Sequence, residues 1–301
     1  MHMIVVFDTN VYRSMFGSLK TPKEVEAKVK GLIEKEARKG VKAYMSSVVA
    51  MELLNHLRDS SDSTDFKSCL NAAQALYLHT GDKDSFSVLP LPEAQIAMEY
   101  FNTAFTRVED SQKVLGQLLY RISQDPQEST LDKMCGELEQ VSSYLSKARS
   151  ILGNVAPMVA EGKTNKEYKT FILSGEFQRE TARAMLCAVC MGIRNIPQEE
   201  ALNIISEKMI DSYVKSHEVS LRFRAHFWSC FIDEGFKPSG KRSNSIWDEM
   251  ILSHVGRTIN NEKIVVVTED SQMHKAADTS GYQGLVMGVD EYKAYLDESC
   301  E

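Results

Sequence analysis

The sequence contains no long hydrophobic run. None of its apolar stretches approaches the roughly 20 residues that a membrane-spanning helix needs. The N-terminus shows no basic region followed by a long apolar stretch, so we expect no secretory signal. Together these absences predict a cytoplasmic protein without membrane contact.

Cysteine is scarce. Six cysteines are scattered along 301 residues, which is too sparse for a disulfide framework and favours a reducing cytosol. Cys187 and Cys190 have the spacing of half a zinc site, but the sequence offers no second pair. The apolar residues around them, among them Leu186 and Val189, indicate a buried helix face instead.

Positive charge is also in deficit. The chain has 35 lysines and arginines against 42 aspartates and glutamates, which gives a net charge of −7. Such a balance is not typical of a nucleic-acid-binding protein. A metal site built from carboxylates would contribute to it, because only the bound metal offsets the charge of its ligands.

Both ends of the chain alternate between strand and helix patterns. Near the N-terminus, a buried strand over residues 4–7 precedes a helix whose start is marked by Thr21, Pro22 and Glu24. A short strand near residues 41–45 and a helix over residues 47–57 follow. Near the C-terminus, the pattern predicts a helix, a strand, a helix, a strand and a helix, over residues 247–255, 263–268, 271–277, 285–287 and 290–296. This alternation predicts an α/β domain with a parallel sheet.

The middle of the chain shows no convincing strand pattern. Apolar residues recur there at helical spacing, and the predicted helices include residues 176–191, 197–215 and 219–235. We therefore predict an all-α insertion, residues 105–242, between two parts of the α/β domain, residues 1–104 and 243–301. The clearest loop is the Gly-, Pro- and Ser-containing stretch of residues 235–244.

Four carboxylates lie at predicted corners of the sheet. Asp8 ends the first strand, Glu52 lies in the helix after the second, Asp248 lies near the start of a later helix, and Asp270 follows the Val-rich strand. Ligands of open α/β sheets bind beyond the carboxyl ends of the strands. Each acid taken singly is most simply a helix cap or a solvated residue. Together they would repel one another unless a cation lay between them, which predicts a site for Mg²⁺ or Mn²⁺.

Four motifs around these acids resemble those of the PIN-domain nucleases. The motifs are Asp8-Thr9-Asn10, Ser47 followed by Glu52-Leu53, Asp248-Glu249-Met250-Ile251-Leu252, and Val267-Thr268-Glu269-Asp270. Residues 88–101 and the late Glu291-Tyr292 pair also fit that family, so that the resemblance covers about residues 3–102 and 243–295. It implies a three-layer, Rossmann-like parallel-sheet domain. Ordinary small PIN domains lack the helical insertion, and we hypothesise that this insertion regulates activity or restricts the substrate.

The resemblance implies metal-dependent hydrolysis of phosphodiester bonds, usually in RNA. Asp8, Asp248 and Asp270 are then expected to bind Mg²⁺ or Mn²⁺, and Glu52 to be a further ligand or to orient one. RNA is the implied substrate, and single-stranded DNA stays open. The sequence does not decide whether the protein is a toxin, a defence effector or an RNA-processing enzyme. It also leaves open a partnership with an antitoxin or another regulatory protein, and assembly into a homo-oligomer.

Polar and cationic residues near these acids have expected supporting roles. The resemblance implies that Asn10 and Thr268 hold carboxylates or water by hydrogen bonds. Lys237, Lys241 and Arg242 lie in the loop before Asp248, where they either hold substrate phosphates or are merely solvated. Residues 222–228 mix cations with aromatics, and we favour a helix with its aromatic residues packed inward over a base-stacking surface.

Two other functions fit part of the pattern. Haloacid-dehalogenase-type phosphatases also place an Asp-x-Asp motif after a first strand, but here Asn10 replaces the acid that would protonate the leaving group. A catalytically silent PIN-like scaffold would bind a partner through the helical insertion, although the presence of all four acids argues for activity. His254 and His274 we interpret as helix-surface residues.

Overall fold

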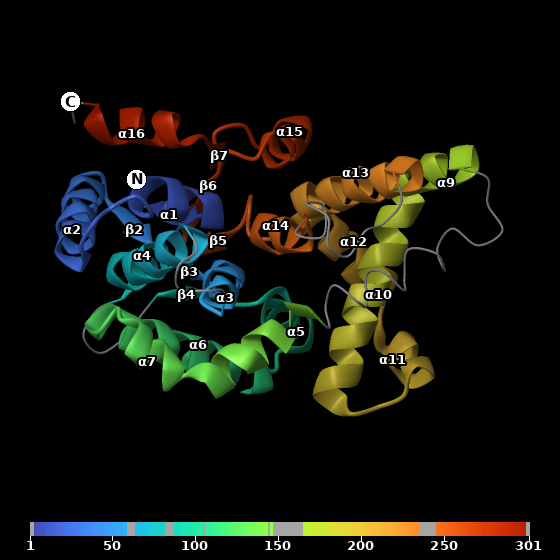
Figure 1. Cartoon of the computed structure of the whole chain (residues 1–301). Coiled ribbons are helices and arrows are strands. Elements are labelled where there is room, and N and C mark those ends of the chain that lie inside the picture. Colours follow the sequence, from blue (N-terminus) through green and yellow to red (C-terminus); the bar gives the residue numbers. More distant parts are fainter. Residues whose placement is uncertain are drawn as a thin grey trace.

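The computed structural model describes residues 3–58, 64–81, 87–104, 106–143, 145–146, 165–234 and 245–298. One lobe is built around a small sheet, and helices α9 to α13 gather beside it in a second lobe, which we call the helical lobe (Figure 1). The helical lobe consists of α9 (Asn165–Ile172), α10 (Gly175–Arg194), α11 (Gln198–Ile204), α12 (Glu207–Ser216) and α13 (Glu218–Glu234).

The sheet is mostly parallel, and β1 lies at its centre. β1 (Met3–Phe7) pairs in parallel with β2 (Val41–Ala43) on one side and with β6 (Glu262–Val267) on the other. β7 (Val286–Met287) pairs in parallel with β6. Every residue of β1 is buried, which explains its continuous apolar sequence. The carboxyl ends of these parallel strands therefore meet at one edge.

Three short strands extend this arrangement. β3 (Met45–Ser46) follows β2 after a single residue and pairs in parallel with β4 (Val88–Leu89). β5 (Thr258–Ile259) runs antiparallel to β6. The turn between β5 and β6 consists of Asn260 and Asn261, both at positive φ, as a two-residue hairpin turn requires.

Helices of the N-terminal part pack around α4 (Thr64–Thr80). α4 contacts α1 (Thr9–Phe16), α2 (Pro22–Arg38) and α3 (Ser47–His56). The C-terminal part adds α14 (Ser245–Leu252), which lies against α3, α15 (Ser271–Thr279), which lies against β7, and α16 (Val289–Asp297), which lies against α2. The predicted α/β class with a parallel sheet is thus confirmed.

The predicted insertion, residues 105–242, divides into two differently packed parts. The described part contains helices and no strand. α6 (Thr106–Gln124) contacts α3 and α4, and α7 (Glu128–Asp132) follows it, so that Leu118, Ile122 and Leu131 belong to the core of the sheet lobe. The helical lobe has smaller cores of its own, to which Ile96 of α5 (Pro92–Phe101) also contributes. The insertion is therefore not one separate helical unit.

One predicted helix in the insertion is wrong in its middle. The single helix expected over residues 197–215 is two helices, α11 and α12, because Ile205 adopts an extended conformation. Ser206 then caps α12, its hydroxyl oxygen accepting a hydrogen bond from the Met209 amide at 3.3 Å. The predicted buried face around Cys187 and Cys190 is confirmed, since both thiols are buried.

A buried polar network holds α1 in place directly after β1. The Tyr12 hydroxyl and the His79 Nδ1 are 2.9 Å apart, and His79 Nε2 lies 2.8 Å from Glu36 Oε2. The second oxygen of Glu36 accepts a hydrogen bond of 2.6 Å from the Tyr292 hydroxyl. The network links α1, α4, α2 and α16, and its buried polar atoms satisfy one another.

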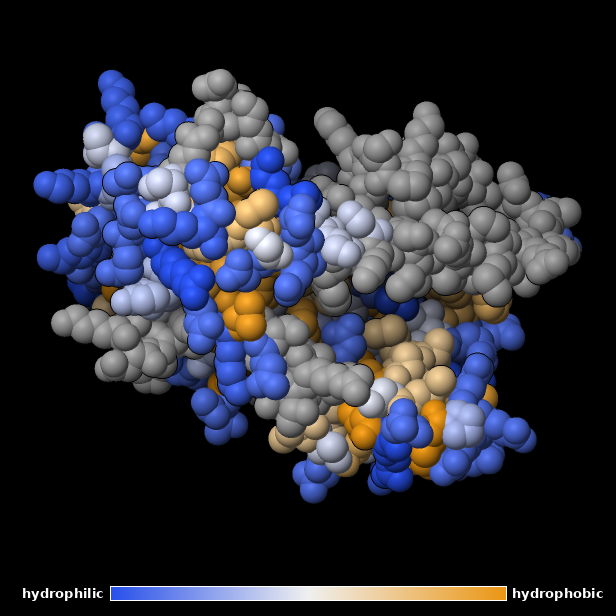
Figure 2. All heavy atoms as spheres, turned by 60° about the horizontal axis from the view of Figure 1, so that its bottom comes forward, coloured by the Kyte–Doolittle hydropathy of each residue, from blue (hydrophilic) through white to orange (hydrophobic). Residues whose placement is uncertain are grey.

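Among the residues that Figure 2 colours, hydrophilic side chains predominate on this face, and apolar ones form separate groups between them. In the residues that the structure describes, no helix combines the length and the apolar character needed to cross a bilayer.

Candidate functional site

Asp8 and Thr268 lie side by side because of the strand register. Phe7 at the end of β1 pairs with Val267 at the end of β6, so the next residue of each strand occupies the same position along the sheet edge. The Thr268 hydroxyl donates a hydrogen bond of 2.9 Å to Asp8 Oδ2. Asp8 precedes α1 but its side chain makes no capping hydrogen bond, so the helix-cap interpretation does not account for this acid.

Asp8 is an unfavourably placed carboxylate. It is only 3% exposed, and this burial raises its pKa. The hydrogen bond from Thr268 and the nearby backbone amides of Thr9 and Asn10 lower the pKa, whereas the charge of Asp270 raises it further. The net direction is upward, as expected for a buried acid next to a second acid.

Asp270 caps α15 and shares the Thr268 hydroxyl with Asp8. Its Oδ1 accepts hydrogen bonds from the amides of Gln272 and Met273, at 2.8 and 3.0 Å. Its own amide donates to Thr268 Oγ1 at 3.0 Å. Thr268 therefore connects the ends of β1 and α15. His274, one turn into α15, has its Nε2 2.9 Å from the Thr268 carbonyl oxygen.

Glu52 reaches the same edge from α3. Its Oε2 accepts a hydrogen bond of 2.6 Å from the hydroxyl of Thr9, the residue that follows Asp8. The sequence interpretation gave Thr9 no role. Its place within Asp8-Thr9-Asn10 was the only hint in the sequence that Thr9 belongs to the site. The bond to Glu52 depends on how α3 packs against α1, and a local motif does not show that packing.

Asp248 brings the four acids together. It lies in the first turn of α14, and its pKa is raised well above the ordinary value. Burial is the largest cause, followed by the charges of Asp8, Glu52 and Asp270. Asp248 is therefore within electrostatic reach of the other three predicted site acids, each of which comes from a different element.

The four carboxylates do not converge on a single point. Within the described ranges, no three acidic, histidine or cysteine side chains are arranged so that they could hold one metal ion. The capping bonds of Asp270 and the Thr9–Glu52 bond hold two of the acids in place, and mutual repulsion keeps carboxylates apart. Their donor chemistry suits a hard divalent ion, since every donor is a carboxylate oxygen. Binding one would require at least three of these side chains to move closer together.

The remaining predicted site residues have different positions. Asn10 is exposed on α1, and the side-chain hydrogen bond to Asp8 comes from Thr268 rather than from Asn10. Lys237, Lys241 and Arg242 lie outside the described residues. The surface interpretation of His254 is wrong: the ring is 3% exposed, and burial followed by the charge of Arg257 lowers its pKa to about 3.

The aromatic residues of α13 are turned inward. Phe223, Phe227 and Trp228 are all less than a tenth exposed, which confirms the packed-helix interpretation of this stretch. Arg224 of the same helix forms a two-point ion pair with Glu249, the neighbour of Asp248 on α14. The helical lobe is thereby joined to a helix that carries one of the four acids.

Comparisons with known proteins add no relative. No model of a protein family matches the sequence, and neither the curated proteins nor the solved structures contain a match.

Proposed function

We propose that this protein is a metal-dependent endoribonuclease with a PIN-like, three-layer core, acting in the cytoplasm. The observation that carries the proposal is the position of Asp248, whose carboxylate is acted on by Asp8, Glu52 and Asp270 from three other elements. Acids whose pKa values are strongly perturbed by burial and by neighbouring acids cluster at functional sites.

Asp8, Asp248 and Asp270 would hold Mg²⁺ or Mn²⁺, with Glu52 beside them. When bound, such an ion stabilises the charge that develops on a phosphoryl group during hydrolysis. Thr268 keeps the Asp8 carboxylate in position, and Thr9 keeps that of Glu52 in position. The first turn of α15 orients Asp270 by donating two backbone hydrogen bonds to one of its oxygens, Oδ1.

The second candidate is a catalytically silent scaffold, and one observation favours it. The four acids do not form a closed set of ligands among the described residues. A scaffold would retain the fold and bind a regulatory protein through the helical lobe. Metal binding that depends on Asp248 distinguishes the two candidates, because a silent scaffold has no use for the ion.

The test is cleavage of end-labelled single-stranded RNA and DNA in Mg²⁺, in Mn²⁺ and in EDTA. We expect metal-dependent cleavage of RNA that is lost in Asp248→Asn. The matched control is Asp290→Asn, the same substitution at a carboxylate that is 98% exposed on α16, and it should cleave like wild type. Cleavage that survives in Asp248→Asn would contradict the proposal. Absence of cleavage together with absence of metal binding would favour the scaffold.

A further inference from the structure

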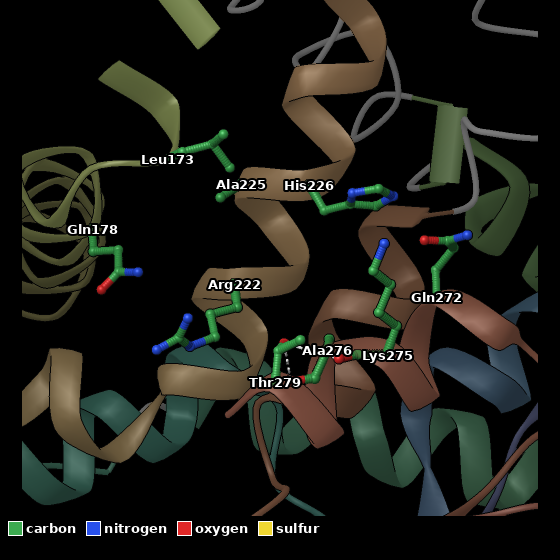
Figure 3. Close-up of a pocket in the computed structure, with 9 residues that line it drawn as sticks. All are labelled: Leu173, Gln178, Arg222, Ala225, His226, Gln272, Lys275, Ala276 and Thr279. Atoms are coloured by element: carbon green, nitrogen blue, oxygen red, sulfur yellow. Dashed lines mark hydrogen bonds between the residues drawn. The ribbon is translucent and has the colours of Figure 1, made fainter. Parts of the chain in front are cut away.

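A cleft lies between the helical lobe and α15, the helix that Asp270 caps. It has a volume of about 220 Å³. Arg222, Ala225 and His226 line it from α13, and Gln272, Lys275 and Ala276 line it from α15 (Figure 3). The two helices contact each other, so the cleft is part of the junction between the helical lobe and the sheet lobe.

The charge of the cleft is opposite to that of the protein. The chain carries a net charge of −7, yet none of the described residues that line the cleft is acidic. Lys275 is exposed and forms no ion pair with any described residue. Figure 3 shows its side chain extending from α15 toward His226 on α13. Arg222 is paired with Glu218, but a guanidinium has donors left for a second acceptor. These features suit a phosphate group.

Apolar side chains also line the cleft. Leu173 at the end of α9 lines it and is 66% exposed, although it is a large hydrophobic side chain. The methyl groups of Ala225 on α13 and Ala276 on α15 also line the cleft. Sites for single strands combine cations that contact the backbone with side chains, most often aromatic ones, that pack against the bases.

The cleft is close to the acidic site. Gln272 lines the cleft with its side chain, while its amide donates to Asp270 Oδ1. Lys275 follows Asp270 by five residues, which corresponds to roughly 7–8 Å along a helix axis. The cleft therefore lies within a short distance of Asp270.

We propose that this cleft binds one nucleotide of a single-stranded RNA next to the acidic site. Lys275 contacts the phosphate, and the base lies against Leu173. This inference rests on the proposed nuclease function, and it gives an acidic protein a local cationic site for a nucleic acid.

The test is binding of a fluorescently labelled single-stranded RNA, followed by anisotropy in EDTA so that no cleavage occurs. In Lys275→Gln we expect about tenfold weaker binding. The slope of log K against log salt should also fall by about 0.7, the value for one lost phosphate contact on a single strand. Lys275→Arg should retain binding. The control Lys113→Gln, at a lysine on α6 that is 70% exposed, should bind like wild type.

A second variant tests the apolar contact with the base. Leu173→Ser removes an exposed side chain and leaves folding intact. It should weaken binding of RNA but not of an abasic oligonucleotide of the same length. Equal binding by wild type and Lys275→Gln overturns the inference even if the protein cleaves RNA. Equally strong competition by polyglutamate also overturns it, because the cleft would then be a site for an acidic protein. Conversely, weaker RNA binding by Lys275→Gln without any cleavage by wild type would support the cleft as an RNA-binding site and contradict the nuclease function.

Discussion

The ion pair between Arg224 and Glu249 offers a quantitative test of how the helical lobe is attached to the site. Arg224 Nε donates to Glu249 Oε2 at 2.8 Å, and its Nη2 lies 2.5 Å from Oε1. The side chains are only 22% and 13% exposed, so neither charge is well solvated. Removing one partner leaves the other buried and unpaired, which costs about 3–5 kcal/mol.

The perturbation is a double-mutant cycle with Arg224→Met and Glu249→Leu. Each single variant should lose about 3–5 kcal/mol of unfolding free energy, whereas the double variant should lie close to wild type because its two apolar side chains pack without leaving a charge. Urea unfolding measures this as a lower midpoint at unchanged m-value.

The matched control is a second arginine on the same helix. Arg222 and Glu218 form an i,i+4 pair with side chains that are 43% and 33% exposed. Arg222→Met should therefore cost only about 0.3–0.5 kcal/mol. If Arg224→Met costs no more than Arg222→Met, or if the two substitutions in the cycle simply add, the pair is not buried as the structure describes it.

Three further predictions concern the acids and the network behind them. Burial and three neighbouring acids raise the pKa of Asp248 in the folded protein. Ionisation of Asp248 therefore destabilises the fold, and this destabilisation sets in as the pH rises from the ordinary carboxyl pKa through the raised one. Asp248→Asn should therefore unfold at higher temperature than wild type near pH 8 in EDTA, with a difference that vanishes below about pH 4; equal effects at both pH values would contradict this. Mn²⁺ at about 100 times its Kd should stabilise wild type against thermal unfolding by about 2.7 kcal/mol and leave the stability of Asp8→Asn unchanged. An equal rise in the unfolding temperature of both proteins would mean that the ion binds elsewhere. Tyr292→Phe should lower the free energy of unfolding in urea by about 1.5–3 kcal/mol, because a buried oxygen of Glu36 loses its hydrogen bond of 2.6 Å. Tyr295→Phe on the same helix should change this free energy little.

The sheet could be predicted because buried strands have a distinctive sequence. β1 is entirely apolar and the last four residues of β6 are Ile and Val, all buried, and polar residues follow both strands immediately. Their parallel pairing then determines that Asp8 and Thr268 meet, since both follow the last paired residues. The meeting of Asp8 and Thr268 therefore follows from the order of the strands, and the alternation of strand and helix patterns in the sequence indicates that order.

Other parts could not be predicted, for reasons that are physical. α4 escaped prediction because it is surrounded by other helices: Cys69, Ala72, Ala73 and Ala75 are fully buried, so its sequence lacks an apolar stripe opposite a polar one. The break between α11 and α12 rests on a single serine cap, without a proline or glycine to mark it. The Thr9–Glu52 bond depends on the packing of two helices that lie far apart in the sequence.

The way in which the insertion packs changes how its role should be tested. Removing residues 105–240 would expose the core of the sheet lobe, because Leu118, Leu119 and Ile122 of α6 are buried in that core. Loss of activity in such a deletion would therefore say nothing about regulation. The helical lobe contacts the site region through α13, which packs on α14 with Asp248 and on α15 behind Asp270. Because two of the four acids lie on or at the start of helices held by α13, a shift of the lobe would change their separation. Substitutions at the α13 surface, rather than deletion, are the perturbation that isolates this coupling.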